Sequence, residues 1–168
     1  MATEPERVAT LSLGGNEGDV IKAFRLALNS LAATPGVEVI ARSRVWRTPP
    51  WGKTDQPDFL NMAAALRTRL SARALLERCQ DIEREGGRQR HERWGPRTLD
   101  IDIITFGDAA INEPDLVVPH PRAVERAFVL APLAEIAPDA RIGGARVADL
   151  LARLGLGGAQ PLGLLPPD

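Results

Sequence analysis

The chain has 168 residues, of which 44% are hydrophobic and 26% are charged. These values are typical of an ordinary globular domain and exclude a disordered, collagenous or disulfide-stapled chain. Its 21 basic and 22 acidic residues nearly cancel, so the overall charge gives no reason to expect a nucleic-acid or membrane partner. We expect a single domain over residues 1–168, with a core large enough to fold without a metal or a disulfide.

The cysteine content and the first residues indicate in which cellular compartment the protein is expected. Cys79 is the only cysteine, so it has no partner for an internal disulfide. Residues 1–7 lack the basic and apolar regions of a signal peptide, and no apolar run approaches the roughly 18 residues of a membrane span. We therefore expect a cytoplasmic protein, and a monomer is the default expectation.

The first third of the chain predicts a strand, a helix, a second strand and a loop. Residues 8–13 alternate between apolar and polar positions, as in a half-buried strand, and residues 20–31 carry apolar side chains at helical spacing. Residues 37–46 alternate again and predict one strand. Residues 47–58 contain three prolines and a glycine, which exclude a helix or a central strand there.

The middle of the chain repeats this order. Residues 59–70 alternate as a third strand, and Ser71 is placed to cap a helix that ends at Gly86. Residues 88–97 show no periodicity. Residues 98–106 then predict a fourth strand.

The last part of the chain gives weaker signals. Residues 111–120 form a connection with a short extended piece, and residues 122–137 predict one or two short helices interrupted by Pro132. Apolar residues from 147 to 154 indicate a final amphipathic turn or two. We expect residues 1–7 and the Gly-, Pro- and Leu-rich residues 155–168 to be loosely ordered tails.

The order strand, helix, strand, strand, helix, strand is the split βαβ pattern of ferredoxin-like folds. Both main helices then lie on one face of an antiparallel sheet, and the later helices cover the other face. The sequence thus predicts an α+β fold: a ferredoxin-like antiparallel sheet with helices on both faces, which is an α/β/α sandwich. This architecture by itself assigns no function.

Two carboxylates in the fourth predicted strand are candidate metal ligands. Asp100 and Asp102 are two residues apart, so both project from one face with their Cα atoms about 6.5 Å apart. Such a pair suits Mg²⁺, which takes oxygen ligands and brings substrate phosphates with it. A solvated polar face is the alternative, but the neighbouring residues are apolar. Alternation continues the aspartate face with Ile104 and Phe106, and fills the opposite face with Leu99, Ile101 and Ile103.

Positive charge is concentrated just before this strand. Residues 84–97 contain five arginines against two glutamates. A charged surface loop is the simpler interpretation. However, arginines next to a carboxylate pair also complement a polyphosphate whose remaining charge is held by a metal ion. A nucleoside triphosphate is the ligand that fits both features.

Other polar and aromatic residues are ambiguous by themselves. Glu83 is either an ordinary exposed residue or a partner of an arginine, and His120 and Arg126 could be structural or functional. Trp46 is expected to bury apolar area. Trp51 lies at a loop tip, where an indole could cover a flat ring, and the amide of Asn61 could bind the edge of a heterocycle.

Four segments together resemble one enzyme family. Residues 47–52, 56–61, 93–102 and 118–120 read RTPPWG, QPDFLN, RWGPRTLDID and VPH. In this order they resemble the 6-hydroxymethyl-7,8-dihydropterin pyrophosphokinases of folate biosynthesis. The likeness extends over about residues 8–137.

The resemblance implies that the β,γ-pyrophosphoryl group of ATP passes to the hydroxymethyl oxygen of the pterin and that AMP is released. Asp100 and Asp102 would bind two Mg²⁺ ions, and the catalytic residues would be Arg88, Arg97, Asp100 and Asp102. The residues implied on the ATP side are Gln80, Glu83, Arg88, Arg90, Trp94, Arg97, Ile103, His120 and Arg126. Those implied in the pterin pocket are Thr48, Pro49, Trp51, Phe59, Asn61 and Phe128. The implied partners are small-molecule substrates, with no nucleic acid and no membrane.

Two alternatives remain at this point. A ferredoxin-like RNA-binding module would use the arginine-rich segment to contact phosphates, but it needs exposed aromatic residues where this strand carries Asp100 and Asp102. A catalytically silent relative would bind the same ligands without turnover.

Overall fold

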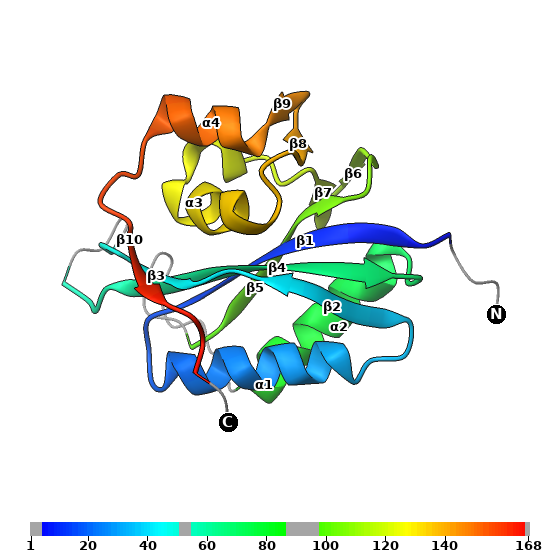
Figure 1. Ribbon diagram of the computed structural model, residues 1–168. Coiled ribbons are helices and arrows are strands. Elements are labelled where there is room, and N and C mark those ends of the chain that lie inside the picture. Colours follow the sequence, from blue (N-terminus) through cyan, green and yellow to red (C-terminus); the bar gives the residue numbers. More distant parts are fainter. Residues whose placement is uncertain (1–4, 51–54, 87–97, 167–168) are drawn as a thin grey trace.

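The computed structural model describes residues 5–50, 55–86 and 98–166, and it is a three-layer sandwich (Figure 1). Helices α1 (Val20–Ala32) and α2 (Ala72–Glu85) form the lower layer in Figure 1. Helices α3 (Ala127–Ile136) and α4 (Val147–Leu154) form the upper layer. The predicted α/β/α sandwich is confirmed, and helices cover both faces of the sheet.

The central sheet has the strand order β10-β3-β4-β1-β5, and β2 also pairs with β4. Its strands are β1 (Arg7–Gly15), β2 (Val37–Arg42), β3 (Val45–Thr48), β4 (Phe59–Thr68), β5 (Asp100–Phe106) and β10 (Gln160–Gly163). β1 lies in the middle and runs antiparallel to both β4 and β5. This is the ferredoxin-like arrangement that the order of elements predicted. In the part of the chain that the structure describes, helices pack on both faces of this sheet, whereas an RNA-binding module would use an open face.

Both main helices begin where a side chain caps them. Asp19 accepts a hydrogen bond from the Lys22 N–H of α1 at 3.0 Å. Ser71, the predicted cap, accepts one from the Ala74 N–H of α2 at 3.1 Å. These bonds satisfy donors that the first helical turn leaves unpaired.

Two apolar cores lie on opposite faces of the sheet. The lower core packs the inward side chains of β1, β4 and β5 against α1 and α2, with Phe24, Leu28 and Leu75 fully buried. The upper core packs Ile104 of β5 and Ala63 of β4 against α3 and α4. A strand residue therefore reaches one core or the other according to the face from which it projects.

The single strand predicted for residues 37–46 is instead divided into β2 and β3. Arg42 pairs with Ala64 and Trp46 with Asn61, so this side has one residue more than β4 between the two pairs. Ser43 lies in this bulge and exchanges two hydrogen bonds with Ala63: its N–H donates to the Ala63 carbonyl, and its Oγ accepts from the Ala63 N–H. Alternation alone does not reveal such a bulge, because both faces of the segment are partly apolar.

A second bulge corrects the face expected for Phe106. Leu11 pairs with Ile103 but Thr10 pairs with Thr105, so Ile104 is the extra residue. The Thr10 and Thr105 hydroxyls are hydrogen-bonded at 2.7 Å. As a result, Ile104 belongs to the upper core while Phe106 joins the lower core with Ile103, rather than sharing the aspartate face.

The connection after β5 forms the hairpin β6 (Ile111–Glu113) and β7 (Leu116–Val118), followed by the 3-10 turn η1 (Ala123–Glu125). The expectation that Pro132 interrupts the next helix is wrong, since α3 continues through it. The proline removes one hydrogen bond, while the burial of Pro132 and its neighbours against the sheet favours the helix.

The C-terminal part contains regular structure as well. The two-residue strands β8 (Arg141–Ile142) and β9 (Ala145–Arg146) precede α4. Residues 160–163, in the segment expected to be loosely ordered, form β10 and pair with β3 at the edge of the sheet. Pro161 is compatible with this position because an edge strand leaves half of its backbone groups unpaired.

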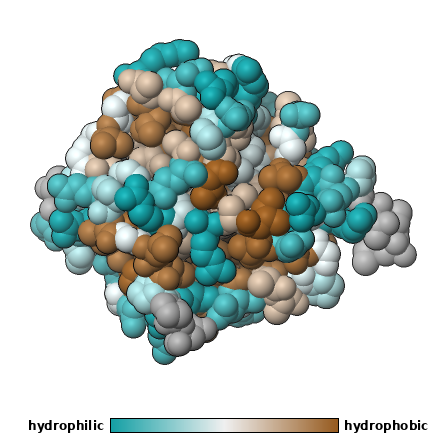
Figure 2. Space-filling view, viewed as in Figure 1, coloured by the Kyte–Doolittle hydropathy of each residue, from teal (hydrophilic) through white to brown (hydrophobic). Residues whose placement is uncertain are grey.

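The outer surface is mixed in character. Ile40 on β2, Leu162 on β10 and Leu164 beyond it are exposed. On the face in Figure 2, the apolar residues form separate patches with polar residues between them. Among the described residues, none of the helices has the length and apolar character required to cross a membrane.

The buried thiol of Cys79 gives a test of the lower core. Cys79 is fully buried, and burial, with Glu83 and Asp102 nearby, raises the pKa of its thiol to about 12. We expect the native protein to react with a thiol reagent only slowly at pH 8, because the thiolate is the reactive form. The denatured chain should release one equivalent of chromophore promptly. Rapid stoichiometric labelling of the native protein would contradict this packing.

Candidate active site

Asp100 and Asp102 lie on the upper face of β5, as alternation predicted. Ile101 and Ile103 between and beyond them point into the lower core, so the two half-buried aspartates project from the other face. Across the β1–β5 ladder, Asp100 lies opposite Gly14. The carboxylates therefore emerge at the end of the sheet where β1 ends and β5 begins.

Glu83 fixes the start of β5. Its side chain is buried at the end of α2, and its Oε2 accepts a hydrogen bond from the Ile101 N–H at 2.8 Å. Ile101 is the residue between the two aspartates. Glu83 is thus a structural link between α2 and the carboxylate pair, which its ambiguous place in the sequence did not reveal.

His120 lies near both Asp102 and Arg126. The His120 N–H donates to the Ile104 carbonyl at 2.9 Å, which holds the histidine against β5. Partial burial lowers the pKa of His120, Asp102 opposes this shift, and the positive charge of Arg126 lowers the pKa further. The Arg122 N–H donates to Nδ1 of His120 at 3.2 Å, so the neutral ring carries its proton on Nε2.

A row of paired residues runs across the strands from Asp100 on β5 to Trp46 on β3. Asp100, Gly14, Asn61 and Trp46 occupy matching positions on β5, β1, β4 and β3. A Cβ atom at Gly14 would lie 2.6 Å from Nδ2 of Asn61, so the glycine provides the space that this amide occupies. The Thr48 hydroxyl donates to Oδ1 of Asn61 at 3.1 Å. The two polar side chains are thereby held in one orientation.

Two of the described residues in the predicted pterin group are aromatic. Phe59 is half-buried and pairs with Thr48 across β3 and β4. Phe128, in the first turn of α3, is half-buried, with the Arg126 guanidinium 5.6 Å from the centre of its ring. Arg126 thus lies close to both Phe128 and His120, which connects the two predicted groups of site residues.

The remaining predicted residues fall into two groups. The Ile103 side chain is in the lower core, so only its backbone is available to a ligand, and Gln80 is exposed on α2 one turn before Glu83. Five predicted site residues lie outside the described residues: Trp51, Arg88, Arg90, Trp94 and Arg97.

Three residues that support the site without belonging to the predicted ligand contacts were not predicted from the sequence. Asn16 is buried after β1, and its Nδ2 donates to Oε1 of Gln56 and to the Pro57 carbonyl, both at 2.9 Å. It fixes the chain that leads into β4. Gly14 was also missed, although its place in the Gly-Gly-Asn segment at a strand end was the available signal.

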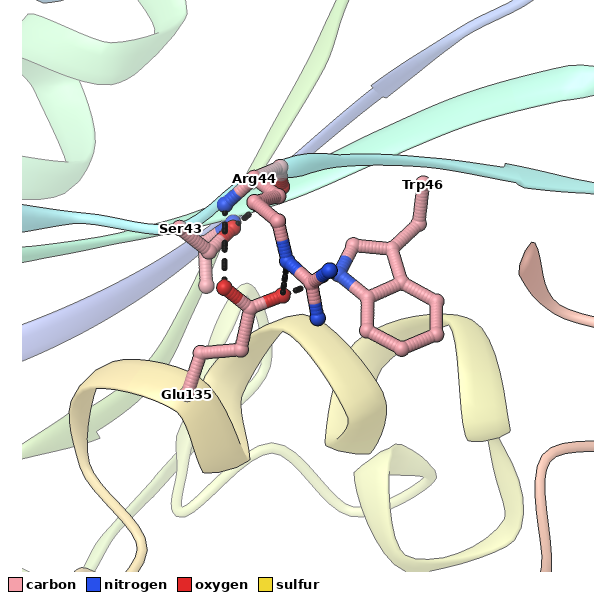
Figure 3. A network of polar contacts seen from close by, with 5 residues as sticks. Ser43, Arg44, Trp46 and Glu135 are labelled. Atoms are coloured by element: carbon pink, nitrogen blue, oxygen red, sulfur yellow. Dashed lines mark hydrogen bonds and ion pairs between the residues drawn. The ribbon is translucent and has the colours of Figure 1, made fainter. Parts of the chain in front are cut away.

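Glu135 of α3 is the third such residue (Figure 3). Its carboxylate accepts hydrogen bonds from the Trp46 indole N–H at 2.5 Å and from the backbone N–H and Nε of Arg44 at 3.2 Å. The Arg44 guanidinium also lies 5.5 Å from the centre of the Trp46 ring. This network joins α3 to the first part of β3 and to the residue before it, close in the chain to Thr48.

The donor set fits a magnesium ion that is completed by substrate. No group of three or more His, Cys, Asp or Glu side chains among the described residues could hold a metal alone. However, Mg²⁺ is commonly bound by one or two carboxylates together with substrate phosphates and water. Asp100 and Asp102 supply two such carboxylates on one face.

Taken together, the fold and the site define an α+β sandwich with two carboxylates and a group of polar and aromatic side chains at one end of its sheet. Comparisons with known proteins agree. Residues 10–138 match the model of the 7,8-dihydro-6-hydroxymethylpterin-pyrophosphokinase (HPPK) family. The chain belongs to this family, and it is therefore a transferase with pterin pyrophosphokinase relatives in folate biosynthesis.

Two curated relatives share the name 2-amino-4-hydroxy-6-hydroxymethyldihydropteridine pyrophosphokinase. The one from Methylorubrum extorquens is 51% identical over 152 residues, which cover 90% of this chain and 96% of the relative. The one from Bacillus subtilis is 48% identical over 129 residues, 77% of each chain. Among solved structures, a Plasmodium falciparum HPPK-DHPS triple mutant matches 91% of this chain with a TM-score of 0.73. At 14% identity this likeness shows the fold alone, and this chain spans 44% of that longer one.

Replacing Glu83 tests its link to β5. We expect Glu83→Ala to lower the free energy of unfolding by about 1–3 kcal/mol, because the buried Ile101 N–H loses its acceptor. Glu83→Gln keeps an acceptor oxygen and should lose less. Urea denaturation followed by circular dichroism measures both. Equal stabilities for the two variants would show that this hydrogen bond does not stabilise the fold.

Proposed function

We propose that this protein transfers the β,γ-pyrophosphoryl group of ATP to the hydroxymethyl oxygen of 6-hydroxymethyl-7,8-dihydropterin and releases AMP. The observation that carries the proposal is the place of Asp100 and Asp102 on one face of β5, near His120, which in turn lies near Arg126. Asn61 lies in line with Asp100 across Gly14. Groups for an anionic ligand and groups for a heterocycle thus share one end of the sheet.

On the nucleotide side, Asp100 and Asp102 would hold two Mg²⁺ ions. When bound, the ions supply positive charge that neutralises the phosphate oxygens and aligns them for transfer. Arg126 adds a fixed positive charge, and the Nε2–H of neutral His120 is the type of donor that a phosphate oxygen accepts. The family resemblance adds Arg88, Arg90, Trp94 and Arg97 to this side.

The edge of β5 offers a further contact for the nucleotide. The Ile101 N–H points away from β1, since it donates to Glu83. Backbone groups alternate in direction along a strand, so those of Ile103 face the same edge. β5 is the last strand of the sheet at this edge. Ile103 therefore fits a role in ATP binding through its backbone and not through its side chain.

On the pterin side, the buried amide of Asn61 offers a donor and an acceptor to the edge of the ring. Thr48 keeps the amide in one orientation. Phe59 and Phe128 would supply flat apolar surfaces, with Pro49 as a further apolar member of the pocket. By the family resemblance, Trp51 would belong to the same pocket. A flat, polar-edged heterocycle suits this combination of groups.

The reaction requires no nucleophilic side chain. The hydroxymethyl oxygen forms a bond to the β-phosphorus while the bond from that phosphorus to the α,β-bridging oxygen breaks. AMP leaves with the bridging oxygen, and the hydroxyl proton passes to solvent. The protein residues would position the two substrates, balance their charge and exclude water.

Product analysis tests the proposal directly. The purified protein is incubated with ATP, Mg²⁺ and 6-hydroxymethyl-7,8-dihydropterin, and the nucleotides are separated by chromatography. We expect AMP in proportion to pterin diphosphate, and no AMP after chelation of the metal. Formation of ADP, or no turnover despite pterin binding, would contradict the proposed transfer.

Substitution of the carboxylates tests the metal ligands. We expect Asp100→Asn and Asp102→Asn each to lower kcat by about 10²-fold or more, because each removes a negatively charged ligand for the Mg²⁺ that would neutralise the phosphates. Asp108→Asn is the matched control, since Asp108 is exposed in the turn at the other end of β5. An aspartate variant as active as Asp108→Asn would remove that carboxylate from the proposed site.

Gly14 tests the pterin side separately. We expect Gly14→Ala to raise KM for the pterin about tenfold, because the new methyl group displaces the Asn61 amide that lies 2.6 Å from its position. The KM for ATP should remain within twofold of the wild-type value. Steady-state kinetics with each substrate varied in turn measure this. Equal increases in both KM values would mean that the change disturbs the sheet end as a whole.

A further inference from the structure

Residues 157–160, which we name the C-terminal strap, run from the upper helical layer to the outer edge of the sheet (Figure 1). They lie beyond residues 10–138, the part that matches the family model. The chain leaves α4 at Gly155 and reaches β10 through the strap. Each of its four residues contacts, or pairs with, an element that carries proposed pterin residues.

The first two strap residues meet both sides of the proposed pterin pocket. A Cβ atom at Gly157 would lie 3.6 Å from the Ala127 Cβ, next to Phe128 in the first turn of α3. A Cβ atom at Gly158 would lie 3.4 Å from Cγ of Pro49, which follows Thr48. The strap backbone therefore packs closely against the start of α3 and the end of β3.

The next two strap residues fix β3 itself. Ala159 is buried against Trp46 and Ala131. It therefore packs on the same Trp46 whose indole N–H donates to Glu135. Gln160 pairs with Arg47 in the β10–β3 ladder, and its Oε1 accepts a hydrogen bond from Nη2 of Arg47 at 3.0 Å. The stretch from Trp46 to Pro49 is thus held along its length by α3 and by the strap.

The path of the strap depends on glycine. Gly157 and Gly158 have φ values of +58° and +89°, in the region that residues with a Cβ rarely adopt. These angles turn the chain so that it passes between Ala127 and Pro49. A Cβ atom at Gly158 would be in direct van der Waals contact with the Pro49 ring, so a side chain there would bear on the pocket residue itself.

We propose that the C-terminal strap is a positioning element for the pterin, which sets the spacing between Pro49, directly after β3, and Phe128 on α3. This inference rests on the proposed function, because it concerns the pterin residues of that same site. Binding of the flat ring requires the two walls to be held at a fixed separation. The carboxylate pair lies on β5, at the opposite edge of the sheet from β10. A change in the strap should therefore affect the pterin and leave the nucleotide unaffected.

The test compares two glycines with similar backbone angles. Gly158→Ala adds a methyl group against Pro49, while Gly144→Ala adds one at φ +84° in the β8–β9 turn, with no atom within 4 Å. Both carry the same type of backbone strain, and only the first meets the pocket wall. We expect Gly158→Ala to raise KM for 6-hydroxymethyl-7,8-dihydropterin about tenfold, with kcat and KM for ATP within twofold of wild type. Gly144→Ala should match the wild type in all three constants.

A second variant keeps the test decisive even when Gly158→Ala folds poorly. Gln160→Ala removes only an exposed side chain and its contact with Arg47, and we expect a rise of about threefold in KM for the pterin alone. If Gly158→Ala and Gln160→Ala both behave as Gly144→Ala, the strap does not position the pterin. The same holds if kcat and both KM values change together, which would indicate a general structural role. Failure of the proposed function is distinct, because the wild-type protein would then form no pterin diphosphate.

Discussion

The pairing of β5 with β1 is the constraint on which the rest of the site depends. In this register Ile101 and Ile103 fill the lower core, and Asp100 and Asp102 consequently face the other side. A shift by one residue would bury both carboxylates against α1 and α2 and expose two isoleucines. The Glu83 bond to the Ile101 N–H reinforces the same register from the end of α2. The same strand register therefore both packs the core and places the charged groups.

The upper helical layer gives the site its second wall. The start of α3 carries Phe128 and follows Arg126, while its last turn carries Glu135, which binds Trp46 on β3 and Arg44 just before it. One short helix is thus held against the sheet at the end away from the substrates. Its other end presents an aromatic ring and a positive charge. This arrangement explains why a partly exposed ionic network lies outside the proposed substrate contacts and still belongs to the architecture of the site.

Sequence patterns predicted most of the fold and misjudged it where the ladder is irregular. Alternation and helical spacing located the main strands and helices because they follow from burial on one face. The bulges at Ser43 and Ile104 each insert one residue, which divided a predicted strand and moved Phe106 to the lower core. Such insertions cannot be predicted from alternation, because they depend on how the strand pairs with its partner.

The sequence by itself determined the family, the order of elements and the aspartate pair, because periodicity and long motifs are local properties of the chain. Only the tertiary structure decided which distant residues share a site. The space that Gly14 leaves for Asn61, the burial of Glu83 beneath β5 and the contact of Gly158 with Pro49 all join residues far apart in the chain. Such contacts are set by strand register and by the packing of layers, and neither is encoded in any single segment.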